Sequence, residues 1–320
     1  MGDRRQWADD PFSGRIAGGI LYGRGACDMK AGLAANLEVV RAIRRSGVQL
    51  ERPLGLHAVI GEEDGGIGAF ATMLRGHTAD AAVITEPTSG RLVVANAGAL
   101  TFRLTVSGRA AHGSARLEGH SAIEAYLPVH AALTALERER NVDADPLFAD
   151  HRLPYPISVG RLSSGDWASS VPDVLIAEGR YGVRLDEDVA QARSVFESAL
   201  AAAGERDPWL RAHPVEVSWP GGQFASGRIA LDHPLIEQTQ TAVADVTGAP
   251  APPRTAASYG SDLRLYAGLG GIPTLHYGPG DVRFAHAPRE QVPVAEVIDT
   301  ARAMALLALR RCGVRGWTGA

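Results

Sequence analysis

The 320-residue sequence is poor in cysteine, in aromatic residues and in long apolar runs. Its two cysteines, Cys27 and Cys312, are too few for a disulfide framework, which favours a reducing, cytoplasmic setting. No apolar stretch reaches the roughly 18 residues of a membrane span, and the first residues lack the layout of a signal peptide. A net charge of −4 gives no reason to expect nucleic acid or an acidic membrane surface as a partner. These absences leave a soluble cytoplasmic α/β protein as the simplest class.

Four segments run from a short apolar stretch directly into a polar turn marked by glycine or proline. They span residues 19–28, 54–63, 81–87 and 272–280. Helical patterns separate the first three, and one of them ends at Gly47. Its recurring apolar residues are Leu33, Leu37, Val40 and Ile43. This alternation of strand and helix favours a largely parallel sheet covered by helices.

The middle of the sequence follows another pattern. Residues 99–108 alternate apolar and polar side chains with a period of two, as a half-exposed strand does. Three more strand candidates and two helical stretches follow. The sequence therefore predicts an α/β catalytic domain of residues 1–98 and 222–320 with a mostly parallel sheet. A smaller α+β domain, residues 99–221, interrupts it.

Acidic residues stand where the expected strands end. Asp28, the pair Glu62 and Glu63, and Glu86 each follow a strand, and His286 follows the fourth strand. Each has an ordinary explanation taken singly: Asp28 as a helix N-cap, the glutamates as solvated turns, and His286 as a donor to a backbone carbonyl. Ligands collect at the carboxyl ends of strands in open α/β sheets.

Together, these carboxylates would repel one another unless a cation lay between them. Carboxylates and imidazole without thiolates suit zinc, cobalt or manganese. Of the adjacent pair Glu62 and Glu63, one can bind metal while the other acts as a general base.

The motifs "LYGRGACDMKAG", "GEEDGGIG", "TEP" and "FAHAPRE" resemble, in order, the metal-site motifs of the co-catalytic zinc aminoacylase and carboxypeptidase family. That family includes acetylornithine deacetylase and succinyl-diaminopimelate desuccinylase. The resemblance implies two zinc ions, with cobalt or manganese as substitutes. It makes Asp28 the bridging carboxylate and Glu62 the general base. Glu63 and His286 become ligands of one metal, and Glu86 a ligand of the other.

The same resemblance assigns roles to residues outside the metal motifs. In this family the inserted domain forms a homodimer, and "VSGRAAHGSA" matches the segment whose histidine, here His112, stabilises the oxyanion in the partner subunit. The alternative for His112 is a surface histidine. Arg264 in "SYGSDLRLY" matches the arginine that binds the substrate carboxylate, with a salt bridge to Asp262 as its alternative. Ser169 stands where the family usually has a substrate-binding asparagine.

One family motif is missing. The pattern "H-x-D-V-V-P", whose histidine binds the metal held by Glu86, normally precedes a segment that resembles residues 2–12 here. No histidine precedes His57, which lies within a strand pattern and is a poor substitute. We therefore expect that the chain starts a few residues too late, with one metal site complete and the other limited to Asp28 and Glu86.

The resemblance implies a metal-dependent hydrolase that cleaves the amide bond of an N-acyl amino acid. One alternative is an impaired or inactive homologue, acting as a dimeric binding protein or arising from a mis-started gene. A further alternative is a metallo-carboxypeptidase or dipeptidase acting on short peptides. In each case the partners are a small molecule and a second copy of the chain.

Overall fold

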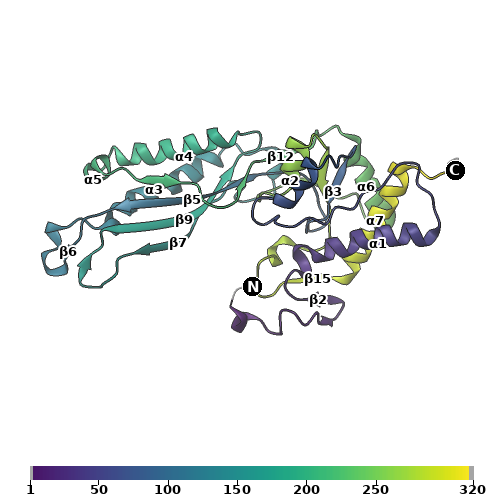
Figure 1. The fold of residues 1–320 in the computed structure, drawn as a ribbon, viewed down its shortest axis with the longest axis horizontal. Coiled ribbons are helices and arrows are strands. Elements are labelled where there is room, and N and C mark those ends of the chain that lie inside the picture. The colour runs from purple at the N-terminus through teal and green to yellow at the C-terminus, as the bar shows by residue number, and fades with distance from the viewer. Residues whose placement is uncertain (1–2, 317–320) are drawn as a thin grey trace.

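The computed structural model describes residues 3–316 and shows an elongated molecule built of two parts (Figure 1). The larger part contains both ends of the described chain and combines a sheet with surrounding helices. The smaller part is formed by the middle of the sequence and carries an antiparallel sheet with helices on one face. The expected fold class, an α/β catalytic domain interrupted by a smaller α+β domain, is confirmed.

The main sheet of the larger part has the strand order β12–β4–β14–β3, and β13 also pairs with β4. These strands are β3 (Ala82–Ile84), β4 (Leu92–Asn96), β12 (Gly227–Arg228), β13 (Arg254–Ala257) and β14 (Thr274–His276). The pairs β13–β4 and β14–β3 are parallel, whereas β12–β4 and β14–β4 are antiparallel. The sheet is therefore mixed rather than mostly parallel. The link of residues 85–91 between β3 and β4 is too short for a parallel crossover, which needs about a dozen residues or more.

Two of the four expected strands are confirmed as β3 and β14, and the other two are placed differently. Residues 20–22 form β2 (Ile20–Tyr22) in a separate antiparallel sheet with β1 (Ile16–Ala17) and β15 (Gln291–Pro293). Residues 54–60 form no strand, because no neighbouring segment of the described chain forms ladder hydrogen bonds with them. The small sheet joins the beginning of the described chain to the segment that follows His286.

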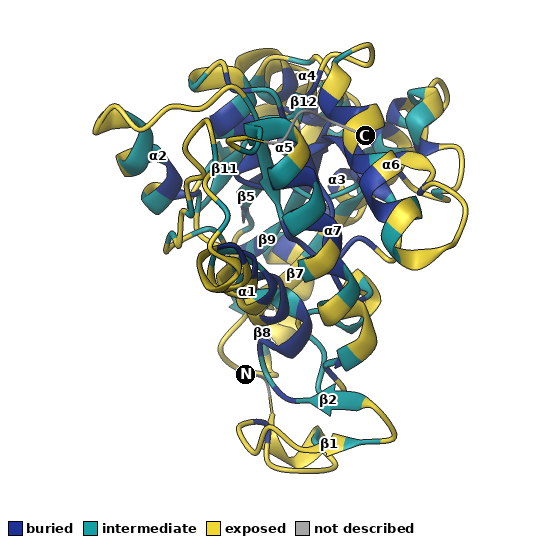
Figure 2. Ribbon diagram, turned by 90° about the vertical axis from the view of Figure 1, so that its right-hand side faces the viewer, coloured by how far each residue is buried: buried dark blue, intermediate teal, exposed yellow. Residues whose placement is uncertain are grey.

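The helices of the larger part are α1 (Ala31–Ser46), α2 (Ile67–Leu74), α6 (Pro234–Thr247) and α7 (Val294–Cys312). Helices α1, α6 and α7 share one apolar core with β4 and β14, in which Val39, Leu92 and Leu307 are buried. Helix α1 ends at Gly47, whose φ of 74° lies in the left-handed region that favours glycine, as the sequence predicts. Figure 2 shows buried and exposed residues on opposite sides of these helices, and a largely exposed segment around β1.

The smaller part is built on two long strands, β5 (Gly98–Ser107) and β9 (Val174–Val183), paired along their whole length. The alternation expected in β5 is confirmed, because every second residue from Gly98 onward is buried. The other strands are β6 (Ala111–His112), β7 (Ile157–Ser164), β8 (Ser170–Val171), β10 (Glu216–Ser218) and β11 (Gln223–Phe224). The helices are α3 (Ala122–Arg140), α4 (Val189–Gly204) and α5 (Pro208–Ala212). Phe102, Val129 and Phe196 join the sheet to α3 and α4 in one core (Figure 1).

Short 3-10 or π-helical turns complete the described chain. They are η1 (Arg4–Gln6), η2 (Ala26–Lys30), η3 (Gly113–Glu118), η4 (Pro146–Phe148), η5 (Leu265–Leu269) and η6 (Val282–Phe284). Of these turns, η2 contains Asp28, and η6 ends two residues before His286. No helix among the described residues is long and apolar enough to cross a membrane.

Candidate metal centre

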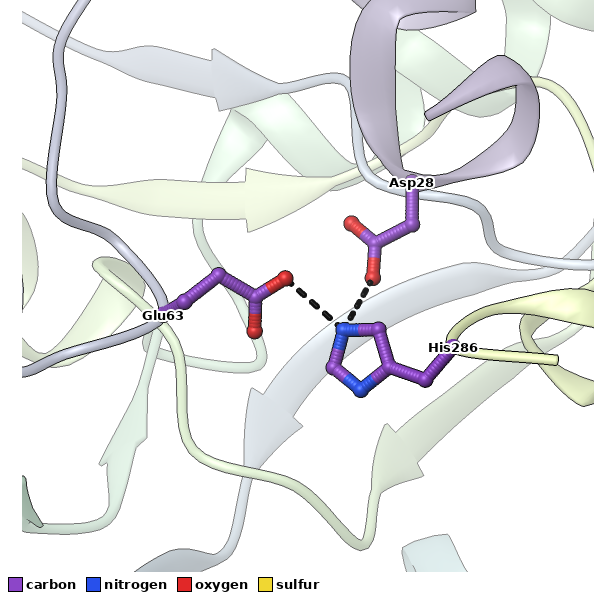
Figure 3. A group of neighbouring side chains, drawn as sticks. All are labelled: Asp28, Glu63 and His286. Carbon is purple, nitrogen blue, oxygen red and sulfur yellow. Dashed lines mark hydrogen bonds and ion pairs between the residues drawn. The ribbon is translucent and has the colours of Figure 1, made fainter. Parts of the chain in front are cut away.

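Asp28, Glu63 and His286 come from three distant segments and meet at one point (Figure 3). The Nε2 atom of His286 lies 2.7 Å from Oε1 of Glu63 and 3.3 Å from Oδ2 of Asp28. One ligand atom from each residue lies within 4.8 Å of the others. Two carboxylates and an imidazole form a donor set that suits a divalent metal such as zinc, cobalt or manganese. The structure therefore brings together three of the four metal ligands that the sequence predicts.

Each of the three residues is placed by a specific local structure. Asp28 lies in η2, directly before α1, and has an extended backbone with φ −115° and ψ 100°. Glu63 lies in a tight turn closed by a hydrogen bond of 2.7 Å from the amide of Gly66 to the carbonyl of Gly61. Both of those glycines have positive φ angles. His286 lies between η6 and β15 with a φ of 55°, which is uncommon for a residue other than glycine.

Glu86 and Glu62 add further carboxylates to this region. Glu86 is buried at the end of β3, and burial, followed by the charges of Asp28 and Glu62, raises its pKa well above the usual range. Burial and the charge of Asp262 raise the pKa of Glu62 to about 8. Burial and the charge of Glu63 likewise raise the pKa of Asp28, which His286 opposes. Carboxylates that crowd one another in this way fit a site that a cation neutralises.

Arg264 lies behind the glutamate turn. It is buried, donates a hydrogen bond of 2.9 Å from Nη2 to the carbonyl of Gly65, and stacks over the ring of Phe224 at 4.6 Å. Among the described residues, both carboxylate oxygens of the buried Asp262 lack a hydrogen-bond partner. Arg264 therefore lies beside the turn that carries Glu62 and Glu63, near the metal centre. It does not form a hydrogen-bonded pair with Asp262 among the described residues.

His112 and Ser169 are neighbours of each other but lie apart from the metal centre. The amide of Gly113 donates a hydrogen bond of 2.7 Å to the carbonyl of Ser169, and His112 pairs with Ser170 between β6 and β8. Both His112 and Ser169 are exposed. Figure 1 shows β6 at the end of the smaller part that is farthest from the larger part. The structure therefore does not bring these two residues to Asp28 within one copy of the chain.

Other residues near the centre were given no metal-binding or catalytic role from the sequence. Glu290, the last residue of the motif "FAHAPRE", is buried and bonds to the backbone of Asp28. Asp262 is buried beside Gly66, with its oxygens unpaired among the described residues. The only sequence signal for Glu290 and Asp262 is that they lie within the motifs "FAHAPRE" and "SYGSDLRLY". His57, judged a poor substitute ligand, instead lies 3.3 Å from the hydroxyl of Tyr266 and is absent from the cluster.

Fold and site together define a class: an α/β protein with a carboxylate and imidazole centre suited to a divalent metal, and with a smaller inserted α+β domain. Residues 1–310 match the family described as "Peptidase family M20/M25/M40". The chain belongs to this family of hydrolases. The resemblance to the aminoacylase and carboxypeptidase family that the motifs carry is thereby confirmed.

Relatives in this family differ in what they act on. The chain is 28% identical to the N-formyl-4-amino-5-aminomethyl-2-methylpyrimidine deformylase of Halalkalibacterium halodurans, covering 98% of this chain and 77% of that one. It is also 28% identical to the acetylornithine deacetylase of Proteus mirabilis, covering 97% of this chain and 76% of that one. The solved structure of an M20 family metallo-carboxypeptidase from Sulfolobus solfataricus has a TM-score of 0.72 at 15% identity, covering 96% of this chain and 81% of that one. This last likeness concerns the fold alone.

Proposed function

We propose that the chain is a metal-dependent amidohydrolase that removes the acyl group from an N-acyl amino acid. The observation that carries this proposal is the convergence of Asp28, Glu63 and His286 within 4.8 Å. The two relatives named as a deacetylase and a deformylase support an acyl group on nitrogen as the substrate. The proposal also divides the chain into a catalytic domain, residues 1–98 and 222–320, and an inserted domain, residues 99–221.

Asp28, Glu63 and His286 would hold one metal ion, for which zinc is the first candidate and cobalt or manganese are substitutes. When bound, the ion supplies Lewis-acid polarisation of the scissile carbonyl and activates water for attack. Asp28 and Glu86 would hold a second ion, with two donors from the described residues. That set is small for tight zinc binding, which uses three protein ligands or four.

Glu62 is the proposed general base. It lies in the same turn as Glu63 and is half-buried, with its carboxylate in the field of Asp28 and Asp262. Its carboxylate would accept the proton of the attacking water and return it to the nitrogen of the leaving amine. Arg264, fixed against the carbonyl of Gly65, would bind the carboxylate of the substrate through its guanidinium group.

His112 and Ser169 would act in the active site of a partner subunit. Both are exposed at the tip of the inserted domain, away from the metal centre of their own chain. His112 would donate a hydrogen bond to the oxyanion that forms during attack, and Ser169 would bind the substrate. This arrangement requires a homodimer formed through the inserted domain.

A second candidate is a metallo-carboxypeptidase or dipeptidase. A probable carboxypeptidase of Aspergillus terreus is 30% identical to this chain, covering 87% of it and 61% of the relative. The two candidates share the metal centre and differ in the group on the acyl side of the amide. An impaired homologue that binds substrate without cleaving it is a third possibility, because the second metal position has few protein donors.

A substrate panel tests the proposal. The purified chain, loaded with Zn²⁺ or Co²⁺, is assayed on N-acetylornithine, N-formyl and N-acetyl amino acids, and dipeptides. We expect hydrolysis of N-acyl amino acids that EDTA abolishes. Cleavage of dipeptides alone would establish the second candidate, and metal binding without hydrolysis would establish the impaired homologue.

The variant Glu62→Gln tests the general base. We expect kcat to fall by about 10²–10⁴-fold, because the amide cannot accept the proton, while bound metal stays unchanged. The control is Asp64→Asn, an exposed neighbour in the same turn that should retain activity. Unchanged turnover in Glu62→Gln would remove Glu62 from the mechanism.

A further inference from the structure

The carboxylate of Glu290 lies directly behind the metal centre, and it is only 1% exposed. Its Oε1 atom accepts hydrogen bonds from the backbone amides of Cys27, at 3.1 Å, and Asp28, at 3.0 Å. Its Oε2 atom accepts from Nη1 of Arg24 at 2.7 Å. A buried carboxylate needs such partners, because an unpaired buried charge is costly. Here two of the three partners belong to the backbone that presents Asp28.

Glu290 is also attached to the segment that presents His286, which precedes it by four residues. Its carbonyl accepts a hydrogen bond of 3.1 Å from the amide of Gly23. The next residues form β15, which pairs residue by residue with β2. The backbone of Glu290 and the following strand thus align the two segments, and its side chain reaches across to the turn of Asp28.

A second contact joins the same two segments on the other side of the turn. The thiol of Cys27 donates to the carbonyl of Asp281 at 3.3 Å. This contact fixes the turn ahead of Asp28 but does not touch the amide of Asp28 itself. Of these two contacts, only the hydrogen bond to Glu290 involves the backbone of Asp28.

We propose that Glu290 is a positioning residue that sets the separation and orientation of Asp28 and His286, and so the metal affinity of the centre. The proposal rests on the metal centre put forward under the proposed function. Groups that orient metal ligands without touching the metal commonly change metal affinity by about 10–100-fold when they are replaced. Its carboxylate accepts hydrogen bonds from the amides of Cys27 and Asp28 and from Arg24, so its positioning effect would act through the backbone of Asp28.

The test uses Glu290→Gln in the full chain, with Co²⁺ alone as the probe. Glutamine has nearly the same shape, but its single carbonyl oxygen cannot serve both Arg24 and the two amides. We expect a loss of Co²⁺ affinity of about 10–100-fold and a changed visible absorption spectrum of bound Co²⁺. Glu290→Asp serves as a second variant if the first does not fold. It keeps the buried charge but withdraws the oxygens from the amides, and it should show the same loss.

Glu187→Gln is the matched control. The side chain of Glu187 is 9% exposed, accepts from Arg140 at 3.0 Å, and accepts from the backbone amide of Arg184 at 2.8 Å. It belongs to the inserted part of the chain, so its replacement should lower thermal stability and leave Co²⁺ affinity unchanged. Equal losses of affinity in the two variants would reduce Glu290 to a general stabilising role and overturn the proposal.

The outcomes separate this inference from the function on which it rests. If the unchanged chain binds no Co²⁺, both the metal centre and the role of Glu290 are overturned. If it binds Co²⁺ and the Glu290 variants bind it with the same affinity and spectrum, the positioning role alone is wrong. Weakened binding with a changed spectrum, and normal binding by Glu187→Gln, supports the proposal.

Discussion

His286 contributes the imidazole donor of the cluster and holds an uncommon backbone conformation. Its φ of 55° lies in the left-handed region, which only a few per cent of residues other than glycine adopt, with asparagine, aspartate and histidine enriched among them. This conformation turns the imidazole back toward Asp28 and Glu63, which lie on other segments. A strained residue at the centre of a ligand cluster is typical of functional sites.

The variant His286→Ala tests its place in the centre. We expect the affinity for Zn²⁺ or Co²⁺ to fall by about 100-fold or more, beyond the loss that outer contacts give, because one of three protein donors is gone. Equilibrium titration with a competing chelator measures this. The control is His57→Ala, because His57 lies against Tyr266 and outside the cluster. Equal affinities in the two variants would contradict the site.

At the scale of residues, the sequence predicts the cluster but not the groups that support it. Asp28, Glu63 and His286 are predicted because they lie in motifs that resemble the family's metal-site motifs, although the strand expected before Glu63 does not form. The proposed role of Glu290 depends on hydrogen bonds from two backbone amides and one arginine. Backbone amides are the same in every residue but proline, so the sequence does not show which of them Glu290 binds. The sequence indicates Asp262 only as a salt-bridge partner of Arg264, and its burial, with both carboxylate oxygens unpaired among the described residues, has no signature in the sequence.

The turn of residues 61–66 is the element that presents both Glu62 and Glu63. Gly66, at its end, has a φ of 74°, and a Cβ atom there would lie 2.1 Å from Oδ1 of Asp262 and 2.6 Å from Leu265. Only glycine allows the turn to approach Asp262 this closely. The position of the two glutamates therefore depends on a residue without a side chain.

The pair Gly66→Ala and Gly76→Ala isolates the effect of this close approach. Gly76 has a φ of 81° and no atom within 4 Å of an added Cβ, so its replacement costs only backbone strain, about 1–2 kcal/mol. Gly66→Ala adds a clash, and we expect a larger loss of unfolding free energy together with a lower kcat. Urea denaturation and steady-state kinetics measure both. Equal losses and unchanged kcat would show that the turn tolerates a side chain.

Helix α1 shows which part of an element the sequence predicts. Its position and its end at Gly47 are confirmed, but its buried residues are Ala31, Gly32, Ala35, Val39 and Ile43. Leu37, expected on the apolar face, is 40% exposed. The helix begins so close to Thr85 that a Cβ on Gly32 would lie 2.0 Å from the Thr85 carbonyl oxygen. Small residues form the face that the first turns of α1 pack against the rest of the protein. A prediction based on large apolar residues therefore puts the buried face of the helix in the wrong place.

At the scale of the whole molecule, the two parts extend away from each other, and His112 lies at the far tip of one of them (Figure 1). His112 is therefore proposed to act in the active site of another copy of the chain rather than in its own. His112 itself lies in a separate two-stranded sheet of β6 and β8 beyond the long sheet of the smaller part. The sequence predicts this arrangement only through the family resemblance, because no local pattern encodes the distance between two domains.

Mixing two inactive variants tests whether active sites are shared. Glu62→Gln lacks the base but keeps His112, and His112→Ala has the opposite defect. If His112 acts in the partner subunit, about a quarter of the sites in an equal, fully exchanged mixture of dimers contain both residues. We expect activity to recover to about that fraction. Activity no greater than the mean of the separate variants would place His112 outside the partner's site.

The metal centre depends on contacts between segments that are far apart in the sequence. Strand β2 pairs with β15, and the amide of Asp28 bonds to Glu290, which lies 262 positions later. Ribosomes add about 5–20 residues each second, so the turn of Asp28 waits on the order of tens of seconds for its partner to emerge. The metal centre therefore forms among the last features of the nascent chain. A chain that ends before residue 286 would contain most of its helices but lack His286, and with it the ligand cluster.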